Sequence, residues 1–298
     1  MGYSKSPHLR NAATLNRTYT LYVTAMQDPA QTFDSIAPIL TVAVLLVMLL
    51  WESVSPCFAF FRHRGKERLL HGIVNFALAI INAVVVGLVF ITAWKWSVDF
   101  SSTRDFGLLR LFEWPRWTEA VIAILLLDCW TYWWHRINHV VPFFWRFHRV
   151  HHSDTRMDVT TANRFHLGEI ALSSLLRIPL LMLLGTELWH LALYELILFP
   201  IVQFHHSNIR LPDGIDRTFR LFFASPAMHK VHHSDQVAET NSNYTSLLSI
   251  WDRIFGSFRL RKDLESIRLG LEEFRKDEQQ QFIPLLLNPA RNPKRSKK

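Results

Sequence analysis

Residues 74–94 read VNFALAIINAVVVGLVFITAW, and no side chain in this stretch carries a charge. About 20 apolar residues in a row are enough for a helix to cross the hydrocarbon core of a bilayer. A buried helix of a soluble protein would normally show a polar stripe along one side, and this stretch shows none. The stretch therefore predicts a membrane-spanning helix.

Three further apolar regions accompany it along the chain. Residues 36–54 carry a single charge, Glu52, and residues 117–134 are interrupted only by two acids, so each predicts another span. Residues 170–204 are long enough for two short helices that turn near residues 185–187, with a re-entrant or interfacial hairpin as the alternative. The pattern predicts an all-α, multi-pass integral membrane protein.

Basic residues in the loops set the expected orientation, because cytoplasmic loops are enriched in Lys and Arg. The loop of residues 56–72 has four basic residues against one acid, so we expect it in the cytoplasm, whereas residues 95–116 mix both signs and belong on the other side. The third span then returns to the cytoplasm at His135, the hairpin ends there at His205, and the C-terminus stays on that side. Every histidine cluster falls on one membrane face, although no histidine entered this argument.

Composition and charge exclude several classes of protein. The formal net charge is +8, but no nucleic-acid-binding motif accompanies it, so we expect no nucleic-acid partner. Five of the last eight residues are basic, which suits a tail beside anionic cytoplasmic lipid. Cys57 and Cys129 are too far apart in sequence for a CxxC pair or a disulfide framework. The first 35 residues lack a short apolar core, so we expect no cleavable signal peptide.

Ten of the fifteen histidines lie in four short clusters. Residues three and four apart share one face of a helix, so each HxxxH or HxxHH segment offers two or three imidazoles to one point. One such motif is weak evidence for a metal, but four clusters together are strong. The clustered histidines are His135 and His139; His148, His151 and His152; His205 and His206; and His229, His232 and His233.

The number of histidines indicates more than one metal ion. A structural zinc ion takes about four ligands, whereas eight to ten converging imidazoles suit two ions. Imidazole binds iron, zinc, copper and nickel, and the lack of nearby cysteine argues against an iron–sulfur cluster. Two alternatives stay open: a histidine-rich membrane metal transporter, and a metal-binding protein without oxygenase activity. Transport sites usually lie near the bilayer midplane, whereas these histidines lie at the ends of spans.

Several segments in order and spacing carry a resemblance to a known family. They are DCWTYWWHRINH at 128–139, FHRVHHSD at 147–154, NRFHLGE at 163–169, HSN at 206–208, SPAMHKVHHS at 225–234, NY at 243–244 and WDRIFG at 251–256. Over residues 117–258 the chain resembles the fatty acid hydroxylase/sterol desaturase superfamily. The resemblance implies a four-helix transmembrane bundle with a cytosolic, histidine-rich dimetal cap.

The resemblance also implies the ligand set, carried over residue by residue. His206 matches the family's histidine before Ser-Asn, while His205 stands where the family often has another polar residue and is a reserve ligand. His166 matches an Arg-Phe-His-Pro-like element in which Leu167 replaces the proline, so it is a tenth ligand or an active-site polar residue. The remaining ligands implied are His135, His139, His148, His151, His152, His229, His232 and His233.

Other polar residues are expected to support the metal site without binding the metal, or to have no role in it. Asp128 lies seven residues before His135 on the same helical face, so we expect its carboxylate to accept a hydrogen bond from a metal-bound histidine; the alternative is an interfacial acid that caps the cytosolic end of the span. Asn243 is expected to pack beneath the site or to form a turn. The isolated His63, His71 and His190 are interpreted as ordinary surface or interfacial histidines.

The implied activity is O2-dependent hydroxylation or desaturation of a lipid of sterol or fatty-acyl type, with two iron ions as cofactor and O2 as co-substrate. The chain has no flavin or nicotinamide fingerprint, so electrons are expected from an external donor, a reductase with a cytochrome b5 or ferredoxin type of carrier. No repeat or linker divides residues 1–298, which we expect to form one domain. Its parts are a polar N-terminal segment (1–35), two spans with their loops (36–116), the catalytic region (117–258) and a basic C-terminal tail (259–298).

Overall fold

A computed structural model describes residues 29–292, and within that range it contains helices and turns but no strand. The predicted polar N-terminal segment lies largely outside the described residues, as do Lys294, Arg295, Lys297 and Lys298. The α-helices are α2 (Pro29–Val54), α3 (Gly65–Val85), α4 (Ile91–Arg104), α5 (Arg116–Val140), α6 (Pro142–His152), α7 (Leu167–Leu184), α8 (Leu188–His206), α9 (Asp213–Phe219), α10 (Pro226–His232), α11 (Val237–Thr240), α12 (Ile250–Ile254) and α13 (Phe282–Leu286). A π-helical turn, η1 (Val86–Phe90), joins α3 to α4, and short 3-10 turns form η2 (Leu108–Arg110), η3 (Val159–Asn163), η4 (Glu272–Phe274), η5 (Asp277–Gln280) and η6 (Asn288–Ala290).

Four helical stretches of the described chain are long and apolar enough to cross a membrane, which makes this an integral membrane protein. They are Ser35–Val54, Gly65–Arg110, Leu167–Leu184 and Leu188–His206. Large apolar side chains on α2 point outward: Ile39 is 72% exposed and Val54 is 77% exposed. Because α2 has no protein cover on that side, lipid is the environment that suits it.

The four stretches differ from the predicted spans in one respect. Residues 117–134 are helical, as predicted, and lie within α5. However, α5 is not among the four apolar stretches, because Glu119, Asp128 and the polar C-terminal turns lower its hydropathy. Conversely, residues 170–204 form two full-length helices, α7 and α8, rather than two short ones. All four stretches therefore overlap predicted regions, and the turn between α7 and α8 falls at residues 185–187 as predicted; of the predicted spans, only residues 117–134 are not among the four.

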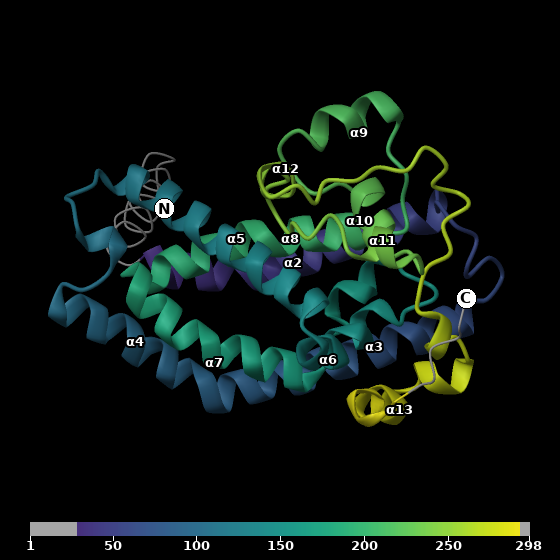
Figure 1. Ribbon diagram of the computed structural model, residues 1–298, viewed down its shortest axis with the longest axis horizontal. Coiled ribbons are helices and arrows are strands. Elements are labelled where there is room, and N and C mark those ends of the chain that lie inside the picture. The colour runs from purple at the N-terminus through teal and green to yellow at the C-terminus, as the bar shows by residue number, and fades with distance from the viewer. Residues whose placement is uncertain (1–28, 293–298) are drawn as a thin grey trace, which may run out of the picture.

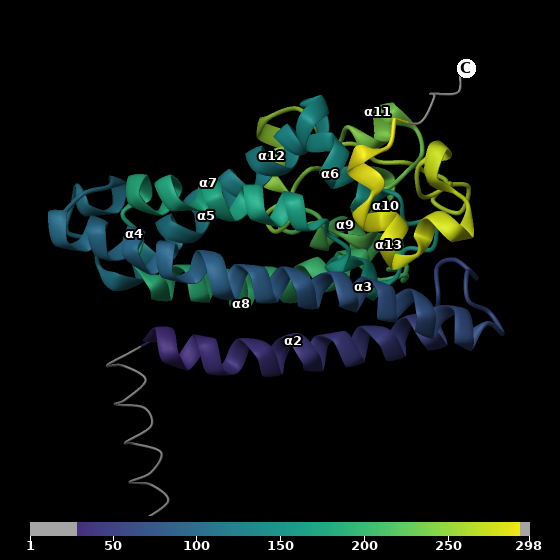
Figure 2. The same ribbon diagram turned by 90° about the horizontal axis from the view of Figure 1, so that it is seen from below.

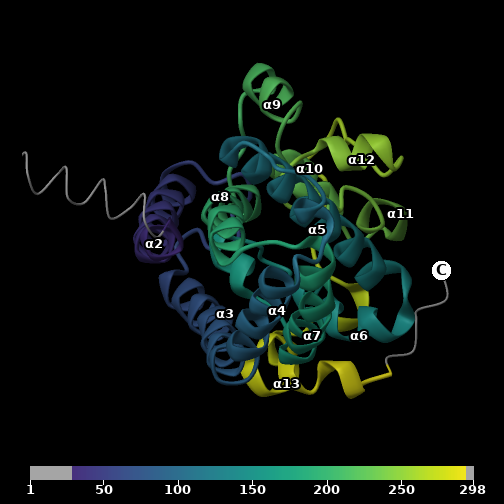
Figure 3. The ribbon, with the colours of Figure 1, turned by 90° about the vertical axis from the view of Figure 1, so that its left-hand side faces the viewer.

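The long helices run side by side along the long axis of the molecule (Figure 1). Helix α2 forms an outer layer against α8 (Figure 2), and a view along the long axis places α2 and α3 on one side and α11 and α12 on the other (Figure 3). The turn after α7 packs closely on the loop after α4: a Cβ on Gly107, whose φ is 124°, would lie 2.4 Å from the Cα of Gly185. Only glycine fits this contact, which fixes the end of the bundle remote from the histidines.

The segment that follows α12 packs onto the histidine-bearing end instead of extending as a free tail. Leu285 of α13 is fully buried in a cluster with Leu78 and Val150. The buried Arg149 donates from Nε to Asn288 Oδ1 at 2.7 Å and from Nη2 to the Arg291 carbonyl at 2.7 Å. Residues up to 292 thus brace helix α6 from outside.

Candidate metal centre

Nine histidines gather at one end of the bundle in two separate groups. The elements that supply them are the last turns of α5 and α8, helix α6, and helix α10 with the residue after it. Pro142 starts α6 directly after α5, so the chain turns and brings the second cluster over the first. The first group is His135, His139, His148, His152 and His232, and the second is His151, His206, His229 and His233; within each group the ligand nitrogens lie within 4.8 Å of one another.

Distances between these nitrogens fit a shared metal ion better than hydrogen bonds. In the second group, His206 Nε2 lies 3.1 Å from His151 Nε2 and 2.9 Å from His229 Nε2, which itself lies 3.2 Å from His233 Nε2. A ring nitrogen has one proton or one lone pair, so it cannot make a full hydrogen bond to two such neighbours. Imidazoles bound at about 2.0–2.1 Å from one ion and about 90° apart have nitrogens about 3 Å apart, as observed.

The opposite ring nitrogens orient several of these histidines. Carbonyl and carboxylate oxygens only accept, so each such partner requires the proton on Nδ1 and leaves the Nε2 lone pair facing the group. The four pairs are His135 with the Tyr244 carbonyl at 2.6 Å, His148 with Glu169 Oε1 at 2.8 Å, His206 with the Val202 carbonyl at 2.7 Å, and His232 with the Ser242 carbonyl at 2.7 Å.

Burial keeps these rings neutral, which is the form that binds metals. Removal from water lowers the pKa of His232 to about 3, because the charged imidazolium loses its hydration and faces other histidines. The same two causes, burial first and mutual repulsion second, lower the pKa of six further members. These are His135, His139, His151, His152, His229 and His233. The donor set therefore fits two ions that accept four or five imidazoles.

His205 is buried beside the second group without belonging to it. Its ring centroid lies 4.0 Å from that of His229 and 4.7 Å from that of His206. The structure thus separates the two histidines of this pair, with His206 inside a group and His205 packed against it.

His166 does not join either group. Its Nδ1 accepts from the Gly168 backbone N–H at 2.9 Å, which caps the start of α7, and its Nε2 lies 3.0 Å from the Leu286 carbonyl oxygen. Both ring nitrogens are therefore engaged by the backbone, and His166 lies outside the two groups that could hold a metal ion. His166 instead fastens the C-terminal segment to helix α7.

Within residues 29–292, Asp128 makes no hydrogen bond to a histidine, so the structure does not bring it to the expected histidine partner. Its carboxylate accepts from Tyr194 Oη at 3.2 Å, from the Leu248 backbone N–H at 3.0 Å and from Trp251 Nε1 at 2.8 Å. The carboxylate is buried (Asp128 is 1% exposed), and these bonds tie α5 and α8 to α12 and to the segment before it. Asp128 stabilises the scaffold that holds the histidines.

Asn243 adopts the turn conformation that was one of its two expected roles. Its φ is 51°, and its amide nitrogen donates to the Met228 and Arg259 carbonyls at 3.0 and 2.7 Å. Its carbonyl oxygen accepts from the Arg259 backbone N–H at 2.8 Å. Asn243 therefore shapes the loop from which the next residue, Tyr244, offers its carbonyl to His135.

Two side-chain contacts next to the histidine groups were not expected from the sequence. Glu169, which accepts from His148, could have been noticed because it is the only acid in the largely apolar helix α7. His71 was expected at the surface, but its Nε2 lies 2.9 Å from Asp154 Oδ2, two residues after His152. Although burial would raise the pKa of Asp154, the charges of His71 and Arg164 hold it well below its usual range. Helix α3 is thus tied to the segment that carries the second histidine cluster.

Comparisons with known proteins place this region in a family. Residues 120–257 match the fatty acid hydroxylase family model. The chain is 33% identical over 163 residues to ornithine lipid hydroxylase OlsE of Rhizobium tropici, covering 53% of this chain and 47% of the relative. Human alkylglycerol monooxygenase is 30% identical, covering 52% of this chain and 34% of the relative. A zebrafish cholesterol 25-hydroxylase-like protein is 28% identical, covering 61% of this chain and 70% of the relative.

The chain therefore spans about half or less of the length of the first two relatives. No solved structure matches it. The match to the family model includes all nine histidines of the two groups, and the relatives named are hydroxylases and monooxygenases of lipids. Residues 120–257 of this chain, which carry both histidine groups, therefore match the fatty acid hydroxylase family.

Proposed function

We propose that this protein is a membrane-bound oxygenase that uses two iron ions and O2 to hydroxylate or desaturate a lipid of sterol or fatty-acyl type. The observation that carries the proposal is the pair of histidine groups, with five and four neutral imidazoles directed at two points. When bound, iron would supply the redox chemistry that activates O2, with electrons from an external carrier of cytochrome b5 or ferredoxin type.

The chain's own residues would hold, orient and enclose the ions. The first group would hold one ion and the second group the other, with His205 and His166 outside the ligand set. Glu169 and the carbonyls of Tyr244, Ser242 and Val202 would fix the tautomers that leave Nε2 free to bind. Four or five imidazoles per ion leave positions for O2, and the C-terminal segment would help exclude water from this end of the bundle.

The membrane supports a lipid as substrate. The histidine groups lie at the end of helices long enough to span a bilayer, so a lipid in the same leaflet would reach them without leaving the membrane. The names of the relatives refer to ornithine lipid, alkylglycerol and cholesterol, all of which are lipids. We further propose that this end and the C-terminus face the cytoplasm, since the basic loop of residues 56–72 packs through Phe58 and Phe60 against Met157 and Val231 beside the histidine clusters.

Untargeted lipid mass spectrometry on a host that expresses the chain tests the proposal. We expect a lipid product heavier by one oxygen or lighter by two hydrogens, and we expect 18O2 to label the former. The product should vanish in His151→Ala and in His232→Ala, which remove one ligand from each group. After chelation, iron should restore turnover and zinc should not. Full turnover with zinc alone would contradict oxygenase chemistry.

A further inference from the structure

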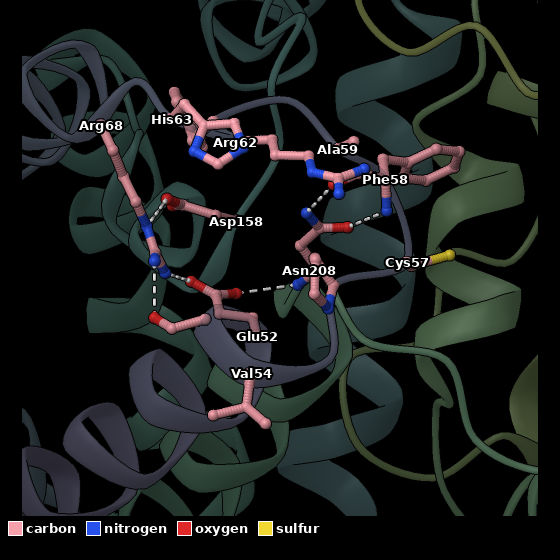
Figure 4. A pocket seen from close by; sticks show the side chains of 13 residues that line it. Glu52, Val54, Cys57, Phe58, Ala59, Arg62, His63, Arg68, Asp158 and Asn208 are labelled. Carbon is pink, nitrogen blue, oxygen red and sulfur yellow. Dashed lines mark hydrogen bonds and ion pairs between the residues drawn. The ribbon is translucent and has the colours of Figure 1, made fainter.

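A pocket of about 590 Å³ lies where the membrane-spanning helix α2 ends and the loop to α3 begins (Figure 4). Its lining includes the apolar side chains of Val54 and Phe58 and the charged side chains of Arg62, Arg68 and Asp158. None of the residues that line this pocket belongs to the two histidine groups or orients their rings. The pocket is a separate feature with its own chemistry.

The wall of this pocket is held in place by Asn208. The Asn208 side chain accepts from the Phe58 backbone N–H at 2.9 Å and donates to the Phe58 carbonyl at 2.8 Å. Its own carbonyl accepts from the Cys57 backbone N–H at 2.8 Å. The loop after α2 is thereby fastened to the end of α8, and the pocket exists before any ligand enters, as binding pockets usually do.

The outer side of the pocket carries an unpaired positive charge. The Arg62 guanidinium is exposed and makes no ion pair or side-chain hydrogen bond with any of residues 29–292. Helix α3 begins at Gly65, three residues later, without a side-chain cap, so the positive end of its dipole adds to the same field. Arg62 therefore suits an anionic group that approaches from the membrane surface.

On the inner side of the pocket, one carboxylate oxygen of Asp158 accepts no hydrogen bond from the described residues. Asp158 is 1% exposed, and its Oδ2 has no hydrogen-bond donor within the described chain; Arg68 Nε lies 3.7 Å from Oδ2, and His71 Nδ1 lies 3.6 Å from Oδ1. The other buried carboxylate, Glu52, is fully engaged by Arg68, Val159 and Asn208. A buried carboxylate oxygen without a donor is costly, so a ligand that brings an N–H donor would be favoured.

The position of the pocket indicates a lipid as the source of this ligand. Val54 is the last residue of the spanning stretch Ser35–Val54, so the pocket opens at the boundary between hydrocarbon and water. Phosphate and ammonium groups of lipids lie at that boundary. We propose that the pocket binds the headgroup of a membrane phospholipid that carries a phosphate and a primary ammonium, as in phosphatidylethanolamine. Arg62 meets the phosphate and Asp158 accepts from the ammonium. This site is independent of the oxygenase function proposed above.

Native mass spectrometry of the full-length protein in detergent, titrated with single lipids, tests the site. Phosphatidylethanolamine should bind about fivefold more tightly than phosphatidylcholine, whose trimethylated ammonium cannot donate, and than phosphatidylglycerol, which has no ammonium. Inorganic phosphate at millimolar concentration should not displace the lipid. Equal binding of the three lipids would overturn the proposal, and displacement by phosphate would show that a free anion is the ligand instead.

Two variants on the same loop sharpen the test. Arg62→Ala should weaken phosphatidylethanolamine binding about tenfold, because a charge-assisted bond to phosphate is lost. Arg64→Ala is the matched control, since Arg64 is exposed, lies outside the pocket lining and only faces Glu67 at 3.5 Å. Equal losses in both variants would mean a general charge effect and would overturn the site. Asp158→Asn should remove the preference for phosphatidylethanolamine over phosphatidylcholine. If this variant does not fold, the titration with the three lipids and the comparison of Arg62→Ala with Arg64→Ala still test the proposal.

Discussion

Replacing Glu169 by glutamine should weaken metal binding in the five-histidine group while leaving the fold intact. Glu169 Oε1 accepts from His148 Nδ1 at 2.8 Å, and both side chains are buried, at 5% and 2% exposure. The carboxylate raises the basicity of the imidazole and fixes the tautomer whose Nε2 faces the ion. Glutamine keeps the length and one acceptor oxygen but removes the charge.

The expected loss of metal affinity in Glu169→Gln follows from the role of this carboxylate as hydrogen-bond partner of a metal-binding histidine. Removing a hydrogen-bond partner of a metal-bound histidine typically costs about 10–100-fold in metal affinity or activity. That range corresponds to about 1.4–2.8 kcal/mol of binding free energy. Glu169→Ala should lose more, because the buried His148 N–H is then left without an acceptor, which adds about 1–3 kcal/mol of destabilisation.

Competition with a chelator of known iron affinity, followed by metal analysis, measures this effect. Glu195→Gln is the matched control: it removes one carboxylate from another membrane-spanning helix, where Glu195 pairs with Arg177 at 2.7 Å instead of a histidine. Thermal unfolding of both variants should match that of the original protein. The reasoning is refuted if Glu169→Gln keeps full iron affinity, or if Glu195→Gln loses as much.

Three further predictions concern the scaffold and the topology. His232→Ala should lose most bound metal and all turnover, whereas His205→Ala should keep most of both; metal analysis beside turnover tests this, and equal losses would place His205 among the ligands. Asp128→Asn should lower the free energy of unfolding by about 1–3 kcal/mol through its contacts with Tyr194, Leu248 and Trp251, with unchanged iron affinity in the folded protein. A cysteine placed at Lys66 should react with an impermeant reagent only after sealed cells are opened, and labelling from outside would reverse the orientation.

The histidine clusters could be predicted from the sequence because their geometry is largely local, but the two groups could not, since His151 and His232 each lie in a different group from the other histidines of their own motif. Spacings of three and four place His148 and His152, or His229 and His233, on one side of a helix whatever else the chain does. Charge in the loops then placed the separate clusters on one membrane face. Both steps need only short-range regularities, and the structure brings these clusters together.

The supporting contacts could not be predicted because they join distant parts of the chain. Asp128 lies on the expected face of α5, but its partners come from residues 66, 120 and 123 positions away, and they reach it before any histidine does. His71 meets Asp154 across 83 positions, a pairing that the packing of α3 on the loop after α6 decides. In the same way, His166 looked like a ligand by motif alone, yet the backbone of Leu286 occupies its free nitrogen.

The central claim is that the nine histidines hold two iron ions, one in each group. Elemental analysis combined with Mössbauer spectroscopy on the purified, reduced protein tests it most directly. We expect two iron ions per chain in two distinguishable histidine-rich environments, because one group has five imidazoles and the other has four. A reproducible value of one metal ion per chain would contradict it.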